Sequence, residues 1–220
     1  RFRMQHYGLP AGGCMDKEAF TLANALVKNN TNEGILEFAY QGPMIELING
    51  KTKIAITGNV IFKIIYKDDT AIEGVCNRSY NLVEGDKVDI LATKDSVYGC
   101  LAVQGGFNLQ PFSNSVSTLA TAGIGPNEGK KITIDEKIIL KKNRNEEKNF
   151  SIDVSLNRTN IIRVLKGAQY EYFMKESHKE FFSSSYNITN LTDRMGMRLN
   201  GPIIKNTINA NIKSEGIIKG

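Results

Sequence analysis

The sequence predicts a mainly β protein of the barrel or sandwich type with one clear helix. Three observations predict it. Short apolar segments recur at close spacing, Gly, Asn and Asp residues separate them, and helices do not alternate with them. With 220 residues the chain is long enough to bury a substantial core.

The clear helix is predicted at residues 17–28. Asp16 can accept a hydrogen bond from an orphan backbone N–H group of the first turn, and Glu18 favours the positive end of the helix dipole. The Gly- and Pro-containing segment 8–13 leads into the helix, and the polar run 29–32 ends it. Apolar residues at three- and four-residue spacing form the buried stripe, namely Ala19, Phe20, Ala23, Leu26 and Val27.

Seven strands are predicted before residue 143, each bounded by turn residues such as Gly42-Pro43 and Asn49-Gly50. They are residues 35–39, 44–48, 53–57, 60–66, 87–91, 97–103 and 131–140. Residues 1–142 are therefore expected to form the first β domain.

A second, smaller region is expected after a polar linker or exposed loop at residues 143–158. Residues 161–165 look like a strand, residues 170–180 look like a short helix, and segments 186–189 and 197–199 look extended. Residues 159–220 number about 60, which is few for an independent core, so we expect a truncated second β domain.

Composition excludes several classes of function. The net charge of +5 is spread over the chain without a basic stripe, which argues against nucleic-acid binding. No apolar run approaches the roughly 18 residues of a membrane span, which predicts a soluble protein.

The cysteines and histidines give two further expectations. Cys14, Cys76 and Cys100 are widely spaced, which favours reduced thiols in the cytoplasm. The two histidines, His6 and His178, are distant in sequence, which predicts no metal site. Ile, Asn and Lys make up about three in ten residues, which suggests an AT-rich, bacterial genome.

Two polar or glycine-rich segments admit both a structural and a functional interpretation. The Gly105-Gly106 pair follows an apolar strand, so it forms either a plain turn or a close backbone approach to a ligand. The run 113–118 offers several hydroxyl and amide groups, which indicates either a turn or hydrogen bonding to a polar substrate.

The segment 193–198 brings a carboxylate close to two guanidinium groups. In an extended chain Arg194 and Arg198 would share one face, because their separation is even. Such a pair suits a carboxylate or phosphate ligand, and an ion pair with Asp193 is the structural alternative.

Beyond these patterns, an ordered set of motifs resembles the KipA-like biotin-dependent carboxyltransferase family, which includes allophanate hydrolase subunit 2 and the 5-oxoprolinase C subunit. The matching segments are 8–16 (Gly-Leu-Pro-Ala-Gly-Gly-Cys-Met-Asp), 22–24, 36–37, 55–58, 98–106, 115–118, 162–165 with Gly167, 193–199 and 214–216. Asn114 departs from the family, which has Gly there, and the family's opening strand and its continuation after Gly220 are expected to be missing.

The resemblance implies two related cyclophilin-like β-barrel domains, the second incomplete. It also implies one component of an ATP-dependent 5-oxoprolinase, in which phosphorylation of the lactam oxygen of a small-molecule substrate prepares it for attack by water. The implied partners are a KipI-like B subunit and a LamB/YcsF-like A subunit, with ATP bound in the assembled complex. A KipA-type regulator of a kinase inhibitor and a urea-carboxylase-type carboxyltransferase are the alternatives. No biotin attachment site is expected in this chain.

The resemblance and the side-chain chemistry together nominate eight site residues. Gly105 and Gly106 are expected to supply an oxyanion-type pair of N–H donors, and Arg194 and Arg198 are expected to bind an anionic group. The expected catalytic residues are Gly105, Gly106 and Asp193, and the expected substrate-binding residues are Arg194, Arg198, Ser115, Ser117 and Asp16.

Overall fold

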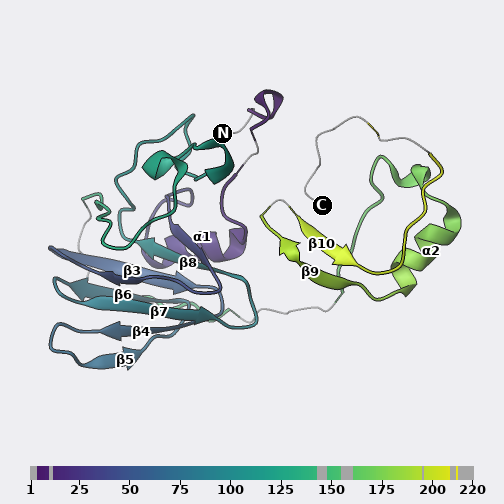
Figure 1. The fold of residues 1–220 in the computed structure, drawn as a ribbon. Coiled ribbons are helices and arrows are strands. Elements are labelled where there is room, and N and C mark those ends of the chain that lie inside the picture. The colour runs from purple at the N-terminus through teal and green to yellow at the C-terminus, as the bar shows by residue number, and fades with distance from the viewer. Residues whose placement is uncertain are drawn as a thin grey trace. The chain divides into compact units, whose positions relative to one another are not determined.

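The computed structural model describes residues 4–9, 12–142, 148–154, 161–194, 196–208 and 212. The chain divides into two compact units, Arg1–Ser155 and Leu156–Gly220 (Figure 1). The expected linker at residues 143–158 is described only in part. Its residues 148–154 belong to the first unit, where the carbonyl of Phe150 accepts a 2.8 Å hydrogen bond from the N–H of Ser79.

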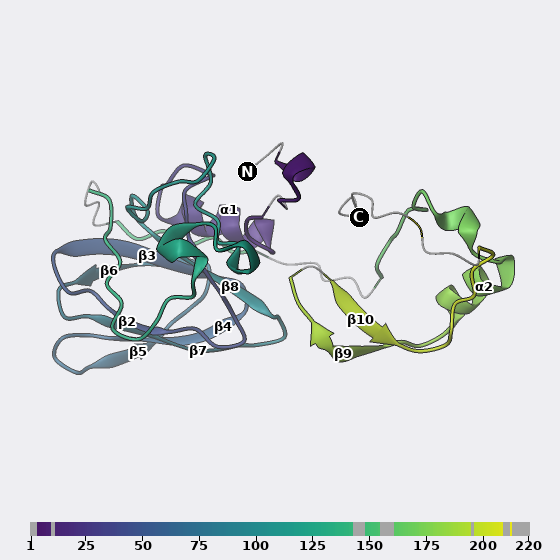
Figure 2. The ribbon, with the colours of Figure 1, turned by 45° about the horizontal axis from the view of Figure 1, so that its top comes forward.

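The first unit consists of two antiparallel four-stranded sheets, seen from two directions in Figures 1 and 2. One has the order β1 (Leu36–Ala39), β8 (Tyr98–Val103), β3 (Lys51–Thr57) and β6 (Arg78–Val83). The other has the order β2 (Met44–Glu46), β7 (Lys87–Thr93), β4 (Val60–Ile65) and β5 (Ala71–Glu73). The expectation of a mainly β fold is confirmed, although within the described residues no strand ladder joins the two sheets into a closed barrel.

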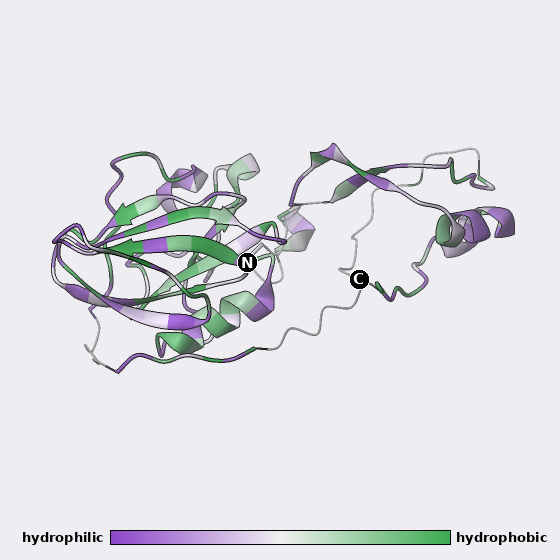
Figure 3. Cartoon of the chain, turned by 90° about the horizontal axis from the view of Figure 1, so that it is seen from below, coloured by the Kyte–Doolittle hydropathy of each residue, from purple (hydrophilic) through white to green (hydrophobic). Residues whose placement is uncertain are grey.

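The main core lies between these sheets. Along β4 the residues alternate between buried and more exposed, as a strand with one covered face requires. Figure 3 shows that these strands are among the most hydrophobic parts of the chain. The buried cluster consists of Phe38, Ile54, Ile56, Val60, Phe62, Ile64, Tyr80, Leu82, Val88, Ile90, Leu101, Val103 and Phe107.

Helix α1 (Lys17–Leu26) covers the other face of β3 and β8. Small sheet residues such as Ala55 and Ala102 leave room for the helix to approach closely, and both are fully buried. As predicted, Asp16 is the N-cap, and its carboxylate accepts the N–H of Ala19 at 2.9 Å. At 10 residues α1 is the longest helix among the described residues, and it ends before the predicted boundary at residue 28.

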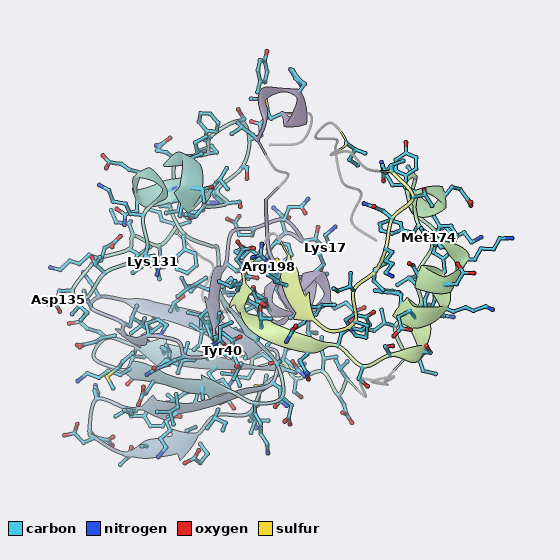
Figure 4. All side chains as sticks on the ribbon, turned by 45° about the vertical axis from the view of Figure 1, so that its right-hand side comes forward. Lys17, Tyr40, Lys131, Asp135, Met174 and Arg198 are labelled. Carbon is cyan, nitrogen blue, oxygen red and sulfur yellow. The ribbon has the colours of Figure 1, made fainter. Side chains whose placement is uncertain are left out.

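One predicted strand, residues 131–140, is wrong. Lys131 and Asp135 (labelled in Figure 4) lie on an irregular segment, in which Asp135 has a φ of 63°. The carboxylate of Glu136 accepts the backbone N–H of Thr133 at 2.9 Å, so a local turn takes the hydrogen bonds that a strand would need. Only Leu140 forms an isolated bridge, with Phe107.

The second unit contains helix α2 (Lys175–Ser183) and a hairpin of β9 (Asn187–Thr192) and β10 (Met197–Asn200). The predicted short helix at residues 170–180 corresponds to η4 (Tyr170–Tyr172) followed by α2. The remaining 3₁₀ turns, in the first unit, are η1 (Gln5–Tyr7), η2 (Ala120–Ala122) and η3 (Pro126–Gly129).

The predicted strand at residues 161–165 is also wrong. It is irregular and exposed, with Leu165 97% accessible, and none of its described residues belongs to a sheet. A β-branched apolar run resembles a strand in sequence, but a strand needs a partner to satisfy its backbone groups.

Candidate functional site

The Gly105-Gly106 turn follows β8 and has the left-handed backbone that glycine favours, with φ values of 80° and 82°. The N–H of Gly105 donates to the side-chain Oδ1 of Asn29 at 2.7 Å. The N–H of Gly106 donates to the carbonyl of Val103 at 2.9 Å. Both donors therefore already have partners inside the chain, and the expected oxyanion pair is not present in this conformation.

Asn29 connects this turn to the helix. Its Nδ2 donates to the carbonyl of Val103 at 2.8 Å and to Oδ1 of Asn24 at 3.0 Å. Asn24 is itself fully buried and donates to the carbonyl of Glu33 at 3.0 Å. Because each amide has both donor and acceptor partners, the network fixes the turn relative to α1.

A carboxylate covers the Gly106 side of the turn. Oε1 of Glu33 forms an ion pair with Nζ of Lys141 at 2.7 Å, and the Glu33 side chain is 19% exposed. A Cβ atom at Gly106 would lie only 2.4 Å from Oε1 of Glu33. The backbone angle therefore favours glycine here, and a Cβ would in addition force the Glu33 side chain to move.

Ser115 and Ser117 lie on a tight hairpin that reaches the same area. Phe112 and Ser115 exchange backbone hydrogen bonds of 2.9 and 3.0 Å around Ser113 and Asn114, whose φ values of 47° and 58° are both left-handed. Asn tolerates this conformation better than most residues, so the departure from the family's Gly at position 114 is compatible with the turn. The N–H of Ser117 donates to the hydroxyl of Ser115 at 3.2 Å.

The loop at residues 12–16 contacts this hairpin. The hydroxyl of Ser117 accepts the N–H of Gly13 at 2.8 Å, three residues before the exposed Asp16. On the other side of the loop, Oε1 of Glu37 accepts the N–H of Met15 at 2.7 Å. Asp16 thus has a structural role as the helix cap, and its exposed carboxylate lies at the edge of this loop.

Val116 packs the serine hairpin against the segment that precedes β1. Its Cγ2 atom lies 2.8 Å from the position that a Cβ would take at Gly34, and Gly34 is adjacent to the carboxylate-bearing Glu33. Three of the expected residues, Asp16, Ser115 and Ser117, thus belong to the hairpin and the loop that contact each other before α1. Gly105 and Gly106 lie elsewhere, because Asn29, which holds Gly105, follows the C-terminal end of α1, whereas Asp16 caps its N-terminal end. The hydroxyl and carboxylate groups of the hairpin and the loop can hydrogen-bond a small polar molecule, and we call Ser115, Ser117 and residues 12–16 the serine–loop site.

The other three expected residues, Asp193, Arg194 and Arg198, belong to the second unit. Asp193 closes the turn between β9 and β10, where its Oδ1 accepts the N–H of Gly196 at 3.1 Å. Arg194 lies in that turn, whereas Arg198 lies on β10 next to an irregularity in the strand register (Figure 4). The premise that both guanidinium groups extend from one strand is therefore wrong, because Arg194 lies in the turn and Arg198 lies on the strand.

The histidines are not part of the serine–loop site. His178 is half-buried and stacks on Tyr170 with 3.8 Å between ring centroids. Its Nε2 lies 3.0 Å from the carbonyl of Tyr170. The rings of His6 and Tyr7 are tilted by 43° to each other, with 3.9 Å between their centroids. Neither contact pairs a histidine with a serine hydroxyl.

The second unit holds the one Met-Lys dipeptide of the sequence, Met174-Lys175, the residue pair that a biotin-carrying segment would contain. Met174 is the N-cap of α2, and Lys175 is its first helical residue (Figure 4). The expectation that no biotin is attached to this chain therefore stays a prediction, which an intact-mass measurement of the purified protein would check.

Sequence reasoning did not identify several residues that shape the glycine turn and the serine–loop site. They are Asn29, Glu33 and Glu37, and each acts through a partner that is distant in sequence. Asn29 and its partner Gly105, for example, are 76 residues apart. Cys14 and Cys100, interpreted as separate thiols, have their sulfur atoms 3.4 Å apart. The adjacency of Asn29 to a predicted helix end is the one local signal, since Asn often satisfies backbone groups there.

Two further findings concern the described residues alone. They include no group of three or more His, Cys, Asp or Glu side chains that could hold a metal ion. No helix among them has the length and apolar character that crossing a membrane would require.

Comparison with known families gives a match over nearly the whole chain. The carboxyltransferase domain family with subdomains A and B matches residues 7–220. The chain is 27% identical to the 5-oxoprolinase C subunit of Escherichia coli (strain K12) over all of this chain and 69% of that protein. It is 26% identical to the 5-oxoprolinase C subunit of Haemophilus influenzae, over 93% of this chain and 64% of that protein. The chain thus spans about two thirds of the length of these relatives.

Larger proteins match over a small part of their length. The urea amidolyase of Lachancea kluyveri is 28% identical over 89% of this chain and 11% of that protein. Among solved structures, TTHA0988 has a TM-score of 0.77 and 25% identity, over 93% of this chain and 73% of that one. The urea amidolyase of K. lactis has a TM-score of 0.75 at 23% identity, over 91% of this chain and 13% of that one, which establishes a shared fold.

Proposed function

Because the chain belongs to the carboxyltransferase domain family with subdomains A and B, we propose that it acts as the C subunit of an ATP-dependent 5-oxoprolinase. In this reaction the lactam of 5-oxo-L-proline is opened to L-glutamate while ATP is hydrolysed to ADP and phosphate. The observation that carries the proposal is the extent of the match to two proteins of that name, which covers 93–100% of this chain and about two thirds of each relative.

The proposed enzyme is a complex in the cytoplasm. A KipI-like B subunit and a LamB/YcsF-like A subunit are its proposed partners, and the name of the relatives, which denotes one component of a complex, supports an assembly of this kind. The Gly105-Gly106 turn does not fit a phosphate cradle, because both N–H groups donate within the chain. We therefore assign no step of ATP chemistry to it.

Within the complex, the serine–loop site is the proposed contact for the small-molecule substrate. Ser115 and Ser117 carry half-buried hydroxyl groups, and Asp16 carries an exposed carboxylate. Hydroxyl groups on a rigid turn suit the polar groups of 5-oxoproline, namely its ring N–H, lactam oxygen and carboxylate. Independently of this site, Arg198, exposed on β10 of the second unit, is proposed to bind an anionic group.

Reconstitution tests this proposal. The protein that carries this chain, mixed with the two partner proteins, is expected to convert 5-oxoproline to glutamate with matching ADP release. Omission of this chain is expected to abolish both products, and Ser117→Ala is expected to lower activity at least about tenfold through loss of a polar contact. Glutamate formation that is equal with and without this chain would refute the assignment.

A carboxyltransferase role in urea use is the second candidate function, favoured by the 28% identity to a urea amidolyase. It predicts carboxyl transfer to urea from carboxybiotin carried by another protein. The same reconstitution separates the two, because carboxyl transfer without 5-oxoproline cleavage would favour this second candidate.

A further inference from the structure

Two thiols meet beneath the loop that precedes α1. The Sγ atoms of Cys14 and Cys100 are 3.4 Å apart, although the residues are 86 positions apart in sequence. Cys100 lies on β8, between β1 and β3, and is 0% exposed. Cys14 lies in the loop and is partly exposed. The outer sulfur therefore belongs to a partly exposed residue, and the inner sulfur lies against it.

A carboxylate orients the outer thiol. Oε1 of Glu37 accepts the S–H of Cys14 at 3.0 Å, and the same atom accepts the N–H of Met15 at 2.7 Å. The loop backbone and the thiol are thus held by a single group. The pKa of Cys100 is raised above its ordinary value by the hydrogen bond with Cys14 and by burial, so the inner sulfur stays a protonated thiol.

We propose that Cys14 and Cys100 form a redox-sensitive pair that a hydroperoxide converts to a disulfide and a low-molecular-weight thiol reduces again. The third cysteine provides the contrast. Cys76 contacts the backbone carbonyl of Val60 at 3.2 Å, and no other thiol contacts it among the described residues. Reversible pairs of this kind are the usual form of disulfide in a reducing compartment.

The oxidation proceeds in two balanced steps. The sulfur of Cys14 attacks one peroxide oxygen, the O–O bond breaks, and the thiol proton passes to the Glu37 carboxylate that accepts its hydrogen bond. This gives a sulfenic acid at Cys14 and releases hydroxide, which takes up that proton as water. Cys100 then attacks the oxidised sulfur, the S–O bond breaks, and the leaving hydroxide takes the Cys100 proton. In total, two thiols lose two electrons and hydrogen peroxide becomes two waters.

A disulfide between Cys14 and Cys100 would shift the loop that contacts Ser117 in the serine–loop site. Because Cys100 sits on an interior strand, the approach of the two sulfurs must come mainly from movement of the loop. That loop holds the hydrogen bonds from Gly13 to Ser117 and from Met15 to Glu37. Oxidation is therefore expected to lower substrate turnover, a consequence that rests on the proposed function.

Peptide mapping tests the pair directly. The reduced protein is treated with hydrogen peroxide, alkylated, digested and analysed by mass spectrometry. We expect a linked pair of peptides containing Cys14 and Cys100, a loss of two hydrogens from the intact mass, and reversal by a thiol reductant. Cys76 is the internal control and should react more slowly than Cys14, because burial raises the pKa of the Cys76 thiol and so lowers its thiolate fraction. Absence of the linked pair, or linkage through Cys76, would overturn the proposal.

Variants separate the two steps. Cys100→Ser is expected to stop the reaction at a sulfenic acid on Cys14, which dimedone traps, whereas Cys14→Ser is expected to leave Cys100 as a thiol. Glu37→Gln keeps an acceptor for Met15 but removes the proton acceptor, so it should slow oxidation without changing the linkage. If Cys14→Ser leaves Cys100 oxidised at the original rate, the proposed order is wrong.

Activity is measured on the reconstituted complex before and after oxidation. If the disulfide forms while lactam cleavage is unchanged, the regulatory consequence is refuted. If the reduced complex shows no lactam cleavage, the proposed function fails, and peptide mapping still decides whether the thiol pair exists.

Discussion

At the scale of the single residue, Gly106 is constrained both by its backbone conformation and by the side chain beside it. Its φ of 82° costs a side-chain-bearing residue about 1–2 kcal/mol. An added Cβ would also displace the carboxylate of Glu33, which is held by the ion pair with Lys141. We predict that Gly106→Ala lowers the free energy of unfolding by about 2–4 kcal/mol, measured by urea denaturation.

The chain offers a matched control at Gly50. Its φ of 84° is nearly the same, and nothing lies within 4 Å of the position a Cβ would take. Gly50→Ala should therefore show only the backbone penalty of about 1–2 kcal/mol. Equal losses for the two variants would mean that Glu33 moves aside freely and that packing contributes nothing at Gly106.

The buried thiol of Cys100 makes stability depend on pH. Its pKa is raised in the folded protein by the Cys14 hydrogen bond and by burial, so the folded state keeps the proton after the unfolded chain has released it. This contribution is complete below the ordinary thiol pKa of about 8.5 and is lost as pH rises above it. We predict that the free energy of unfolding falls by up to about 1.4 kcal/mol per pH unit above that point.

Urea denaturation between pH 7 and pH 10 measures this slope in the wild type and in Cys100→Ala. Tyrosine and lysine residues titrate in both proteins, so the difference between the two slopes isolates the thiol. Identical slopes would contradict the prediction.

At the scale of the element, helix α1 depends on its cap. Asp16 satisfies the N–H of Ala19, so Asp16→Ala is predicted to cost about 0.5–2 kcal/mol of stability. Asp16→Asn keeps an oxygen acceptor and should cost much less. If the Asp16 charge also contacts substrate, the Asn variant will raise KM in the reconstituted complex while its urea midpoint stays near that of the wild type. An unchanged KM would leave Asp16 with a structural role alone.

The elements that sequence predicted correctly are those whose stabilising contacts are local or strongly apolar. Helix α1 follows from its cap and its apolar spacing, and β4 follows from its apolar run. Strand β6 (Arg78–Val83) was missed because polar residues, among them the buried Ser79 and the exposed Asn81, interrupt its apolar pattern. The irregular segment 131–140 was misjudged because the turn around Glu136 competes with strand pairing.

The same distinction explains the site. The glycine pair and the serine run were visible as motifs, and the structure places the serine run against the loop that precedes α1. The partner of the Gly105 N–H was not visible, because Asn29 reaches it only through the packing of α1 on β8. That packing satisfies the N–H of Gly105, and the carbonyl of Val103 satisfies the N–H of Gly106, so a motif that favoured an oxyanion role has a structural role in this conformation.

At the scale of the whole molecule, the two units differ in what holds them together. The first has a continuous apolar core and a helix packed on its sheet. Among the described residues of the second, only Ser177 is buried. Hydrogen bonds of 2.8 and 3.0 Å between Ser177 and Lys205 connect helix α2 to the chain beyond β10.

Such a unit should open far more easily than the first. A two-stranded hairpin is marginal in water without an apolar face packed against it, and β9 and β10 instead expose Ile188, Leu191 and Met197 by 62–67%. We predict that native-state hydrogen exchange of this chain is at least about a hundredfold faster in β9 and β10 than in β3 and β8. Mass spectrometry of peptides from each element measures it, with β3 as the internal reference because it is buried on both faces. Equal protection in the two hairpin strands and in β3 would mean that the hairpin gains its stability from a cooperative unit that includes the first core.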